Sequence, residues 1–193
     1  TQQLLHRAGH VASALIAGSA ALCYADLGPE LLLVEPQLAP DFAGLVGRIA
    51  AHTGRECIDW CGHIQGDGFS LAGNMLAGAA VLDETARAYL ANTALPFARR
   101  LIAAMKAGEA AGGDKRGKQS AALLIHGNEE WSDLDLRVDD HTDPLAELER
   151  LEQVSRQRWV HFRQFIPTRR NPAGITDRAI IDATIEAATA GKA

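Results

Sequence analysis

The sequence has few cysteines, no long apolar run and no excess of positive charge, and each of these absences excludes a class of protein. Three cysteines among 193 residues are too few, and odd in number, for a disulfide framework, and they fit a reducing cytosol. No apolar run reaches the roughly 18 residues that a membrane-spanning helix needs, and no signal peptide is visible. A net charge of −5 disfavours a general nucleic-acid surface. We therefore expect a cytoplasmic protein that binds neither membrane nor nucleic acid.

The remaining composition is typical of a globular protein. Hydrophobic residues make up 47% of the chain and charged residues 22%, which is ordinary for a domain with a buried core. The length allows one such domain with an appendage. We expect the core to span residues 1–155 and a helical extension to span residues 156–193.

Apolar periodicity predicts helices and strands in blocks rather than in alternation. The expected strands span residues 44–54 (bent or paired), 68–73, 120–126 and 133–139, and residues 31–34 are an apolar run of ambiguous type. The expected helices span residues 3–17, two segments of 81–111 that meet near Pro96, residues 144 to about 165 after an Asp143 cap, and residues 177–189 after a Thr176 cap. We expect residues 120–126 to be buried on both faces and to form an antiparallel hairpin with 133–139. These blocks indicate an α+β layered fold.

Residues 112–124 are the most unusual stretch, because a glycine pair, four charges and an amide lead directly into an apolar strand. Residues 112–118 satisfy the phosphate-loop pattern G-x-x-x-x-G-K. However, Gln119 occupies the position of the serine or threonine that would bind magnesium. A phosphate loop also follows a strand and precedes a helix, and the expected order here is the reverse. The pattern therefore does not support a nucleotide site, and residues 114–116 remain unexplained charges.

Two groups of possible metal ligands lack the spacing of a known metal site. Oxygen ligands suit calcium or magnesium, but the acidic group has no EF-hand spacing, and a solvated strand face plus a helix cap accounts for it. The cysteine–histidine group has no standard zinc spacing. We expect no metal and no other cofactor. The two groups are Asp133, Asp135, Asp139, Asp140, His141 and Asp143, and Cys57, Cys61 and His63.

Thr1 is a candidate nucleophile on chemical grounds. A threonine with a free α-amino group carries its own base, because the amine accepts the hydroxyl proton directly or through water. An unperturbed α-amine has a pKa of about 7.7–8.0, which suits this role near neutral pH. Composition does not distinguish a native N-terminus from one produced by trimming, so the residues alone leave this role open.

Three motifs carry a resemblance to a known family. They are residues 73–78 (Gly-Asn-Met-Leu-Ala-Gly), residues 112–124, and residues 135–141 (Asp-Leu-Arg-Val-Asp-Asp-His) with the following Asp143-Pro144 and Glu147-Leu148. Together with residues 47–54, Trp60 and Gly62-His63, they resemble the DUF1028 family over roughly residues 44–150. These are bacterial proteins of unestablished function, with a fold like that of N-terminal nucleophile (Ntn) hydrolases.

The resemblance implies a four-layer αββα sandwich with mostly antiparallel sheets for the core. Family members carry further strands ahead of a Thr-Gln pair, and this chain begins at such a pair, Thr1-Gln2. The resemblance therefore implies that Thr1 is exposed when a precursor cuts itself, and that the missing strands stay docked as a separate N-terminal fragment. The leading hypothesis is an amidohydrolase in which Thr1 attacks a small-molecule or peptide-like amide.

This hypothesis assigns roles to the unusual residues. Asn74 or a nearby backbone N–H would hold the oxyanion. Asp114 and Lys115 would orient Thr1 or tune its amine. The residues expected to contact the substrate are Arg116, Gln119, Asp139 and His141.

Two non-catalytic interpretations compete with the hydrolase. In the first, residues 112–119 of an Ntn-like protein bind a small anionic ligand or form a dimer contact. In the second, the C-terminal helices hold together a homodimer or a higher homo-oligomer, because aromatic and arginine side chains are enriched at interfaces. The residues behind the second are Trp159, Phe162, Phe165 and Ile166, with Arg158, Arg163, Arg169 and Arg170.

Overall fold

The computed structural model describes residues 11–16, 31–34, 51, 53–66, 69–127, 129 and 131–190. The chain divides into two compact units, Thr1–Glu149 and Arg150–Ala193. No helix among the described residues is long and apolar enough to cross a membrane. The structure is α+β, with antiparallel strands and helices, as predicted.

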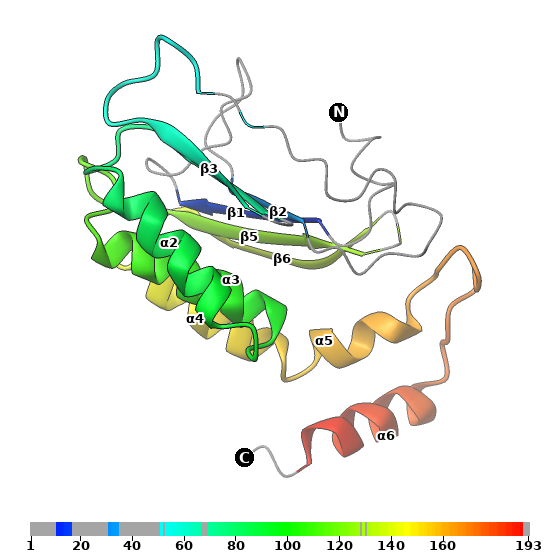
Figure 1. The fold of residues 1–193 in the computed structure, drawn as a ribbon. Helices are drawn as coiled ribbons and strands as arrows, with labels where there is room; N and C mark the ends of the chain where they lie inside the picture. The colour runs from blue at the N-terminus through cyan, green and yellow to red at the C-terminus, as the bar shows by residue number, and fades with distance from the viewer. Residues whose placement is uncertain are drawn as a thin grey trace. The chain divides into compact units, whose positions relative to one another are not determined.

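A sheet of six strands forms the centre of the first unit within the described residues (Figure 1). The strands follow the order β3-β4-β2-β1-β5-β6, and their pairings are antiparallel. Strand β1 therefore lies inside the sheet, between β2 and β5. The strands are β1 (Val11–Ile16), β2 (Leu31–Val34), β3 (Gly62–Gly66), β4 (Phe69–Gly73), β5 (Ala121–His126) and β6 (Ser132–Val138).

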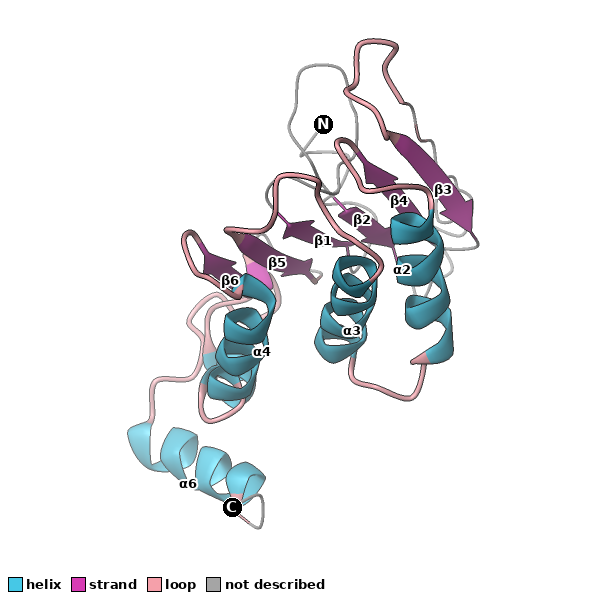
Figure 2. Ribbon diagram, turned by 90° about the vertical axis from the view of Figure 1, so that its left-hand side faces the viewer, coloured by secondary structure: helices cyan, strands magenta, loops and turns pink. Residues whose placement is uncertain are grey.

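Helices α2 (Ala80–Ala91), α3 (Phe97–Ala110) and the first turns of α4 (Pro144–Ser155) cover one face of this sheet (Figures 1 and 2). Phe69 of β4 meets Tyr89 of α2, with 5.3 Å between the ring centroids. Residues that pair across neighbouring strands share a face of the sheet. Fully buried leucines and isoleucines fill the space between the sheet and the helices, which is the core of the unit. They include Leu71, Leu101, Ile102, Leu123 and Leu148.

Helices α2 and α3 pack closely because α3 carries a glycine where the two helices meet. A Cβ atom added at Gly108 would lie 2.2 Å from the Thr85 hydroxyl oxygen and 3.3 Å from the Val81 carbonyl oxygen. The Thr85 hydroxyl donates a hydrogen bond to that same carbonyl, at 2.7 Å. The helix-weakening glycine is therefore required by the packing.

The second unit contains its own small apolar cluster. Helix α4 ends at Ser155, and the short helix α5 (Trp159–Phe162), the 3₁₀ turn η2 (Arg163–Phe165) and helix α6 (Arg178–Thr189) follow. Ile181 and Ile185 of α6 are buried against Phe165, and Phe162 packs on this cluster. Arg158 and Asp182 form an ion pair at 3.2 Å.

Several predicted elements are confirmed. The strand near residues 68–73, the two helices on either side of Pro96 and the hairpin of β5 with β6 all form. Residues 31–34 are a strand. Asp143 caps α4, since its carboxylate accepts a hydrogen bond from the Ala146 N–H at 3.3 Å.

Other sequence predictions are wrong. Val11–Ile16 form a strand rather than part of a helix, because β2 and β5 pair with both of its edges. The helix predicted to reach about residue 165 breaks at residues 156–158, where Arg158 has non-helical backbone angles. Asp177, not Thr176, caps the last helix, because its carboxylate accepts from two backbone N–H groups.

The remaining differences concern strands. β3 was not predicted, because its glycine ends and polar side chains give a weak apolar pattern. Strand β5 is fully buried on one face only, since Ala122 and Leu124 are half-buried. Most of residues 44–54 lies outside the described residues, as do residues 3–10.

The contact at Gly108 leads to a stability prediction. Gly108→Ala should lower the free energy of unfolding by about 1–3 kcal/mol, because the new methyl group overpacks the helix contact. An exposed helix position would gain about 1 kcal/mol from the same change. Urea denaturation of both forms measures the difference.

A second substitution provides the control. Thr85→Ala removes the oxygen that the new methyl group would meet, so we expect it to reduce the cost of Gly108→Ala in a double-mutant cycle. Equal costs in the two backgrounds would contradict this explanation of the glycine.

Candidate functional site

Residues 112–119 connect α3 to β5 through a tight glycine turn. Gly112 and Gly113 have φ angles of 120° and 53°, a region that side-chain-bearing residues rarely occupy. Their N–H groups donate to the Glu109 and Gly108 carbonyl oxygens, which closes the C-terminal end of α3. The two glycines therefore let the chain turn directly after α3, and the charged residues 114–118 follow this turn before β5.

Three segments that are distant in sequence hydrogen-bond side by side at this turn. We call residues 58–60, 74–77 and 113–116 the shelf. The backbone bonds that define it are Met75 N–H to Ile58 O (3.1 Å), Leu76 N–H to Trp60 O (2.9 Å), Ala77 N–H to Gly113 O (2.9 Å) and Lys115 N–H to Met75 O (2.9 Å). The shelf thus fixes the charged residues 114–116 next to Asn74.

Asp114 and Arg116 form an ion pair at the shelf. The Asp114 carboxylate is fully buried, and it lies 2.8 Å from Arg116 Nη2. It also accepts hydrogen bonds from Arg116 Nε at 3.1 Å and from the Arg116 backbone N–H at 2.6 Å. These hydrogen bonds, and then the negative charge of Asp114, raise the pKa of Arg116. Asp114 is therefore engaged as an acceptor, while the Arg116 side chain is 58% exposed and presents its charge to solvent.

The other predicted catalytic residues of the shelf differ in their contacts. Lys115 Nζ donates to the Asp59 carbonyl oxygen at 2.7 Å, which ties the exposed lysine to the first shelf segment. The Asn74 side-chain oxygen is buried and has no hydrogen-bond partner in the described part of the chain. Met75 beside it has a φ of 61°, unusual for a residue with a side chain. Thr1 lies outside the described residues, so its distance from Asn74, Asp114 and Lys115 stays a prediction.

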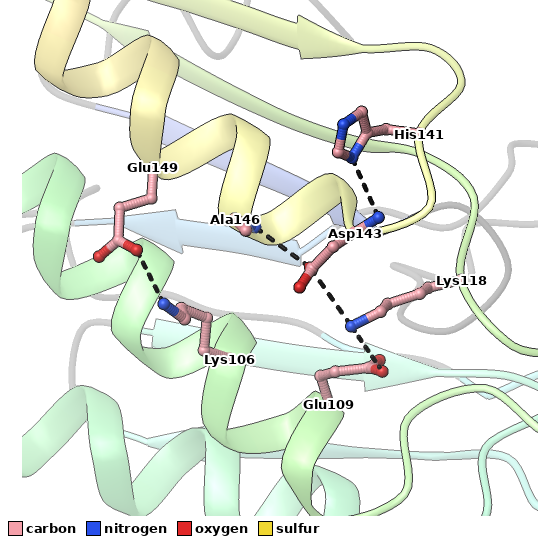
Figure 3. A network of polar contacts seen from close by, with 7 residues as sticks. All are labelled: Lys106, Glu109, Lys118, His141, Asp143, Ala146 and Glu149. Carbon is pink, nitrogen blue, oxygen red and sulfur yellow. Dashed lines mark hydrogen bonds and ion pairs between the residues drawn. The ribbon is translucent and has the colours of Figure 1, made fainter.

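A second group of polar contacts joins α3 to α4 just beyond the shelf (Figure 3). Lys118 Nζ lies 3.3 Å from the carboxylates of both Glu109 and Asp143. The Asp143 backbone N–H donates to His141 Nδ1 at 3.0 Å. Residues 109, 118 and 143 therefore form a bridge between the two helices, which we call the Lys118 bridge.

The bridge shifts the pKa values of its members. The hydrogen bond from the Ala146 N–H lowers the pKa of Asp143 most, burial opposes this, and Lys118 lowers the pKa further. Burial by itself would lower the pKa of Lys118, but its hydrogen bonds to Asp143 and Glu109 outweigh burial and raise it. Asp143 therefore keeps its charge to lower pH, and Lys118 to higher pH, in the folded protein.

The predicted substrate residues lie in two places. The Gln119 carbonyl oxygen accepts a hydrogen bond from the His141 N–H at 2.9 Å, so these two residues are adjacent near the Lys118 bridge. Asp139 instead pairs with Arg137 at 2.8 Å, and both side chains are largely exposed. The structure brings Asn74 and residues 114–116 together, but Asp139 is engaged in a separate pair with Arg137 at the C-terminal end of β6.

Sequence reasoning missed two contributors to this region. In the sequence Lys118 stands out only as the lysine of the phosphate-loop pattern, and the carbonyl oxygens of residues 58–60 carry no sequence signal at all. No group of three or more His, Cys, Asp or Glu side chains converges on a possible metal position within the described residues. His63 instead lies 2.7 Å from the Thr53 hydroxyl, measured between Nδ1 and Oγ1.

Comparisons with known proteins agree on one family. The model of the "Family of unknown function (DUF1028)" matches residues 41–148, a range that contains both the shelf and the Lys118 bridge. The crystal structure of protein SPO2555 from Silicibacter pomeroyi, described with the same family, superposes with a TM-score of 0.63. The two sequences are 24% identical, and the match covers 88% of this chain and 96% of that one. At this identity the likeness shows the fold alone. No curated protein has a significantly similar sequence.

The Lys118 bridge predicts a pH-dependent stability. Because folding lowers the pKa of Asp143, this residue adds to the free energy of unfolding at pH values above its unfolded pKa. That stabilisation disappears as the pH falls through the pKa of Asp143 in the folded protein. Because folding raises the pKa of Lys118, this residue adds to the free energy of unfolding at pH values below its unfolded pKa. That stabilisation disappears as the pH rises through the pKa of Lys118 in the folded protein. Lys118→Met should therefore cost at most about 1 kcal/mol near neutral pH and less at both extremes.

Urea denaturation at several pH values tests this prediction. Lys106→Met is the matched control, because Lys106 bonds a single carboxylate, that of Glu149, at 2.8 Å. At neutral pH we expect Lys106→Met to lower the free energy of unfolding by less than Lys118→Met does. A cost of Lys118→Met that is constant from acid to alkaline pH would contradict an electrostatic bridge.

Proposed function

The chain belongs to the DUF1028 family, and from this premise we propose that it is an amide hydrolase of the N-terminal nucleophile type acting on a small or peptide-like amide. One observation carries the substrate-binding half of this proposal. The buried Asp114 carboxylate orients Arg116, whose side chain is 58% exposed. A fixed and largely exposed arginine side chain suits binding of a carboxylate. We therefore propose a substrate that bears a carboxylate near its amide.

The proposed fold is the four-layer αββα sandwich of such hydrolases. An antiparallel sheet with helices on one face supports it, because these are two of the four layers. The second sheet, the second helical layer and a docked N-terminal fragment belong to the proposal. Fold alone does not assign an activity, so the chemistry is argued from residues.

The proposed reaction uses Thr1 as nucleophile, which rests on the sequence resemblance. The Thr1 hydroxyl attacks the amide carbonyl while its α-amine takes the hydroxyl proton, and the proton then passes to the leaving amine. The Asn74 amide lies in the shelf next to Arg116 and would donate a hydrogen bond to the oxyanion. Water then hydrolyses the acyl ester on Thr1.

The contacts of Asp114 and Lys115 favour positioning roles for these two residues. The Asp114 carboxylate accepts hydrogen bonds from three nitrogen atoms of Arg116, so its contacts serve to orient that side chain. Lys115 holds the Asp59 carbonyl oxygen. We propose that Asp114 aims Arg116 and that Lys115 fastens the shelf.

Hydrolysis of paired amides tests the proposal. We expect release of amine from N-acyl amino acids and slower release from the corresponding N-acyl amino acid amides, which lack the carboxylate. Arg116→Gln should raise KM for the carboxylate substrates about 10- to 100-fold and leave the neutral ones unchanged. Arg137→Gln is the matched control, since Arg137 also pairs with an aspartate at 2.8 Å, but at a site beyond the shelf.

Variants of Thr1 separate catalysis from binding. Thr1→Ala should abolish turnover and retain binding of the N-acyl amino acids, whereas Thr1→Ser should keep part of the turnover. Absence of turnover in every form, with binding that still depends on Arg116, would support the alternative of a non-catalytic protein that binds a small anionic ligand. Absence of both turnover and binding would contradict both proposals.

A second candidate function, as an assembly module, is favoured by the surface of the second unit. Residues 150–193 contain seven arginines, and large apolar side chains are exposed beside them. Interfaces are enriched in arginine and aromatic residues. We propose a second copy of this chain as the partner. The exposed apolar residues are Val154 (42%), Trp159 (37%), Ile175 (41%) and Ile180 (52%).

Substitution on α6 tests the assembly. Ile180→Glu should shift the protein from dimer or higher oligomer to monomer, because it places a charge in the proposed apolar contact. Sedimentation velocity measures the mass. Ala179→Glu adds the same charge at a neighbouring exposed position on a different side of α6, so it should leave the mass unchanged. A mass unaffected by Ile180→Glu, or a monomeric parent protein, would contradict the proposal.

A further inference from the structure

We propose that Cys57 and Cys61 are a reversible oxidation site, at which an intramolecular disulfide closes the loop that carries the first segment of the shelf. The two cysteines flank residues 58–60. Neither forms a disulfide in the structure, and both are partly exposed. The inference concerns the loop itself and is independent of the proposed hydrolase activity.

The geometry places the two thiols together. The Cys57 N–H donates to the Gly54 carbonyl oxygen at 3.3 Å, which turns the chain just before the loop. The Cys61 Sγ lies 3.9 Å from the Cys57 carbonyl oxygen, so the Cys61 thiol lies against the Cys57 residue. A disulfide needs β-carbons about 4 Å apart, and a Cys61 thiol that already lies this close to Cys57 can reach that distance with a small movement of the loop.

The loop between the cysteines supplies three consecutive acceptors to the shelf. The Ile58 and Trp60 carbonyl oxygens accept from the Met75 and Leu76 N–H groups. The Asp59 carbonyl oxygen accepts from Lys115 Nζ. A bond between Cys57 and Cys61 would enclose all three carbonyls in one small ring. Oxidation would therefore restrain the hydrogen bonds that hold residues 75, 76 and 115 in place.

The surroundings of Cys61 favour the oxidised form once it is made. Burial, and then the charges of Cys57 and Asp59, raise the pKa of Cys61. Strongly oxidising dithiol pairs owe their potential to a stabilised thiolate in the reduced form. Cys61 lacks that stabilisation, so we expect a disulfide that forms slowly and resists reduction.

The reaction needs an oxidant, and a small-molecule disulfide supplies one. The Cys57 thiolate attacks one sulfur of the disulfide, forming a mixed disulfide and releasing one thiolate. The Cys61 thiolate then attacks the Cys57 sulfur and releases the second. The protein loses two protons and two electrons, and the small-molecule disulfide takes them up as two thiols.

Mass spectrometry after equilibration with oxidised and reduced glutathione tests the site. Cleavage after Arg55 and Arg87 yields a peptide of residues 56–87 that holds both cysteines. In oxidised samples we expect this peptide to be lighter by two hydrogens and resistant to alkylation, and reduction should reverse both changes. Stable glutathione adducts on Cys57 or Cys61, or two alkylated thiols after oxidation, would overturn the proposal.

Stability and hydrogen exchange give a second readout. A disulfide that closes a loop this short should raise Tm by about 2–8 °C. It should also slow amide exchange at Met75 and Leu76. Cys57→Ser and Cys61→Ser should each abolish both effects, and Cys23→Ser, whose cysteine lies elsewhere in the chain, should abolish neither. If the disulfide forms and amide exchange at Met75 and Leu76 stays unchanged, the proposal that oxidation restrains the shelf is wrong.

Discussion

The backbone hydrogen bonds of the shelf are the constraint on which the candidate site depends. They join residues 58–60, 75–77 and 113–115, and two helices separate the last two segments in the sequence. Backbone N–H groups away from water need partners, so the pairing of Met75, Leu76 and Lys115 determines where the charged segment runs. Without it, residues 112–119 would be an exposed linker between α3 and β5. Gly108 links the shelf to the helices, because it packs against Thr85 of α2 and its carbonyl oxygen accepts the Gly113 N–H.

Neighbouring charges in this segment have different surroundings, and this difference separates their roles. The Asp114 side chain is buried and the Arg116 side chain is exposed, although only one residue separates them. Lys118 is 26% exposed and lies between two carboxylates. A buried carboxylate is costly unless it is paired, so Asp114 holds Arg116 at the shelf while more than half of the Arg116 side chain stays exposed. Lys118 has a structural role between α3 and α4.

Local patterns predicted the elements whose signals lie in adjacent residues. Alternation in residues 133–139 and the apolar run before it were enough for the hairpin of β5 and β6. Proline marked the boundary of α3, and Asp143 with Pro144 marked the start of α4. Val11–Ile16 were mistaken for helix because their apolar spacing suits either structure, and hydrogen bonds from β2 and β5 decide the matter. Asp177 took the cap expected of Thr176, since both residues are good caps and their positions differ by one.

The sequence by itself determined the family, the α+β class and the list of unusual residues, because motifs and periodicity are properties of neighbouring positions. The tertiary structure decided which of these residues meet. It brought Lys115 to the Asp59 carbonyl oxygen across 56 positions, and it put Cys57 and Cys61 on either side of the carbonyls that receive the shelf. Backbone carbonyls carry no side-chain signature, and ion pairs such as that of Lys118 with Asp143 depend on how helices pack. These partners are distant in sequence and meet only in the folded chain, so no local sequence pattern predicts them.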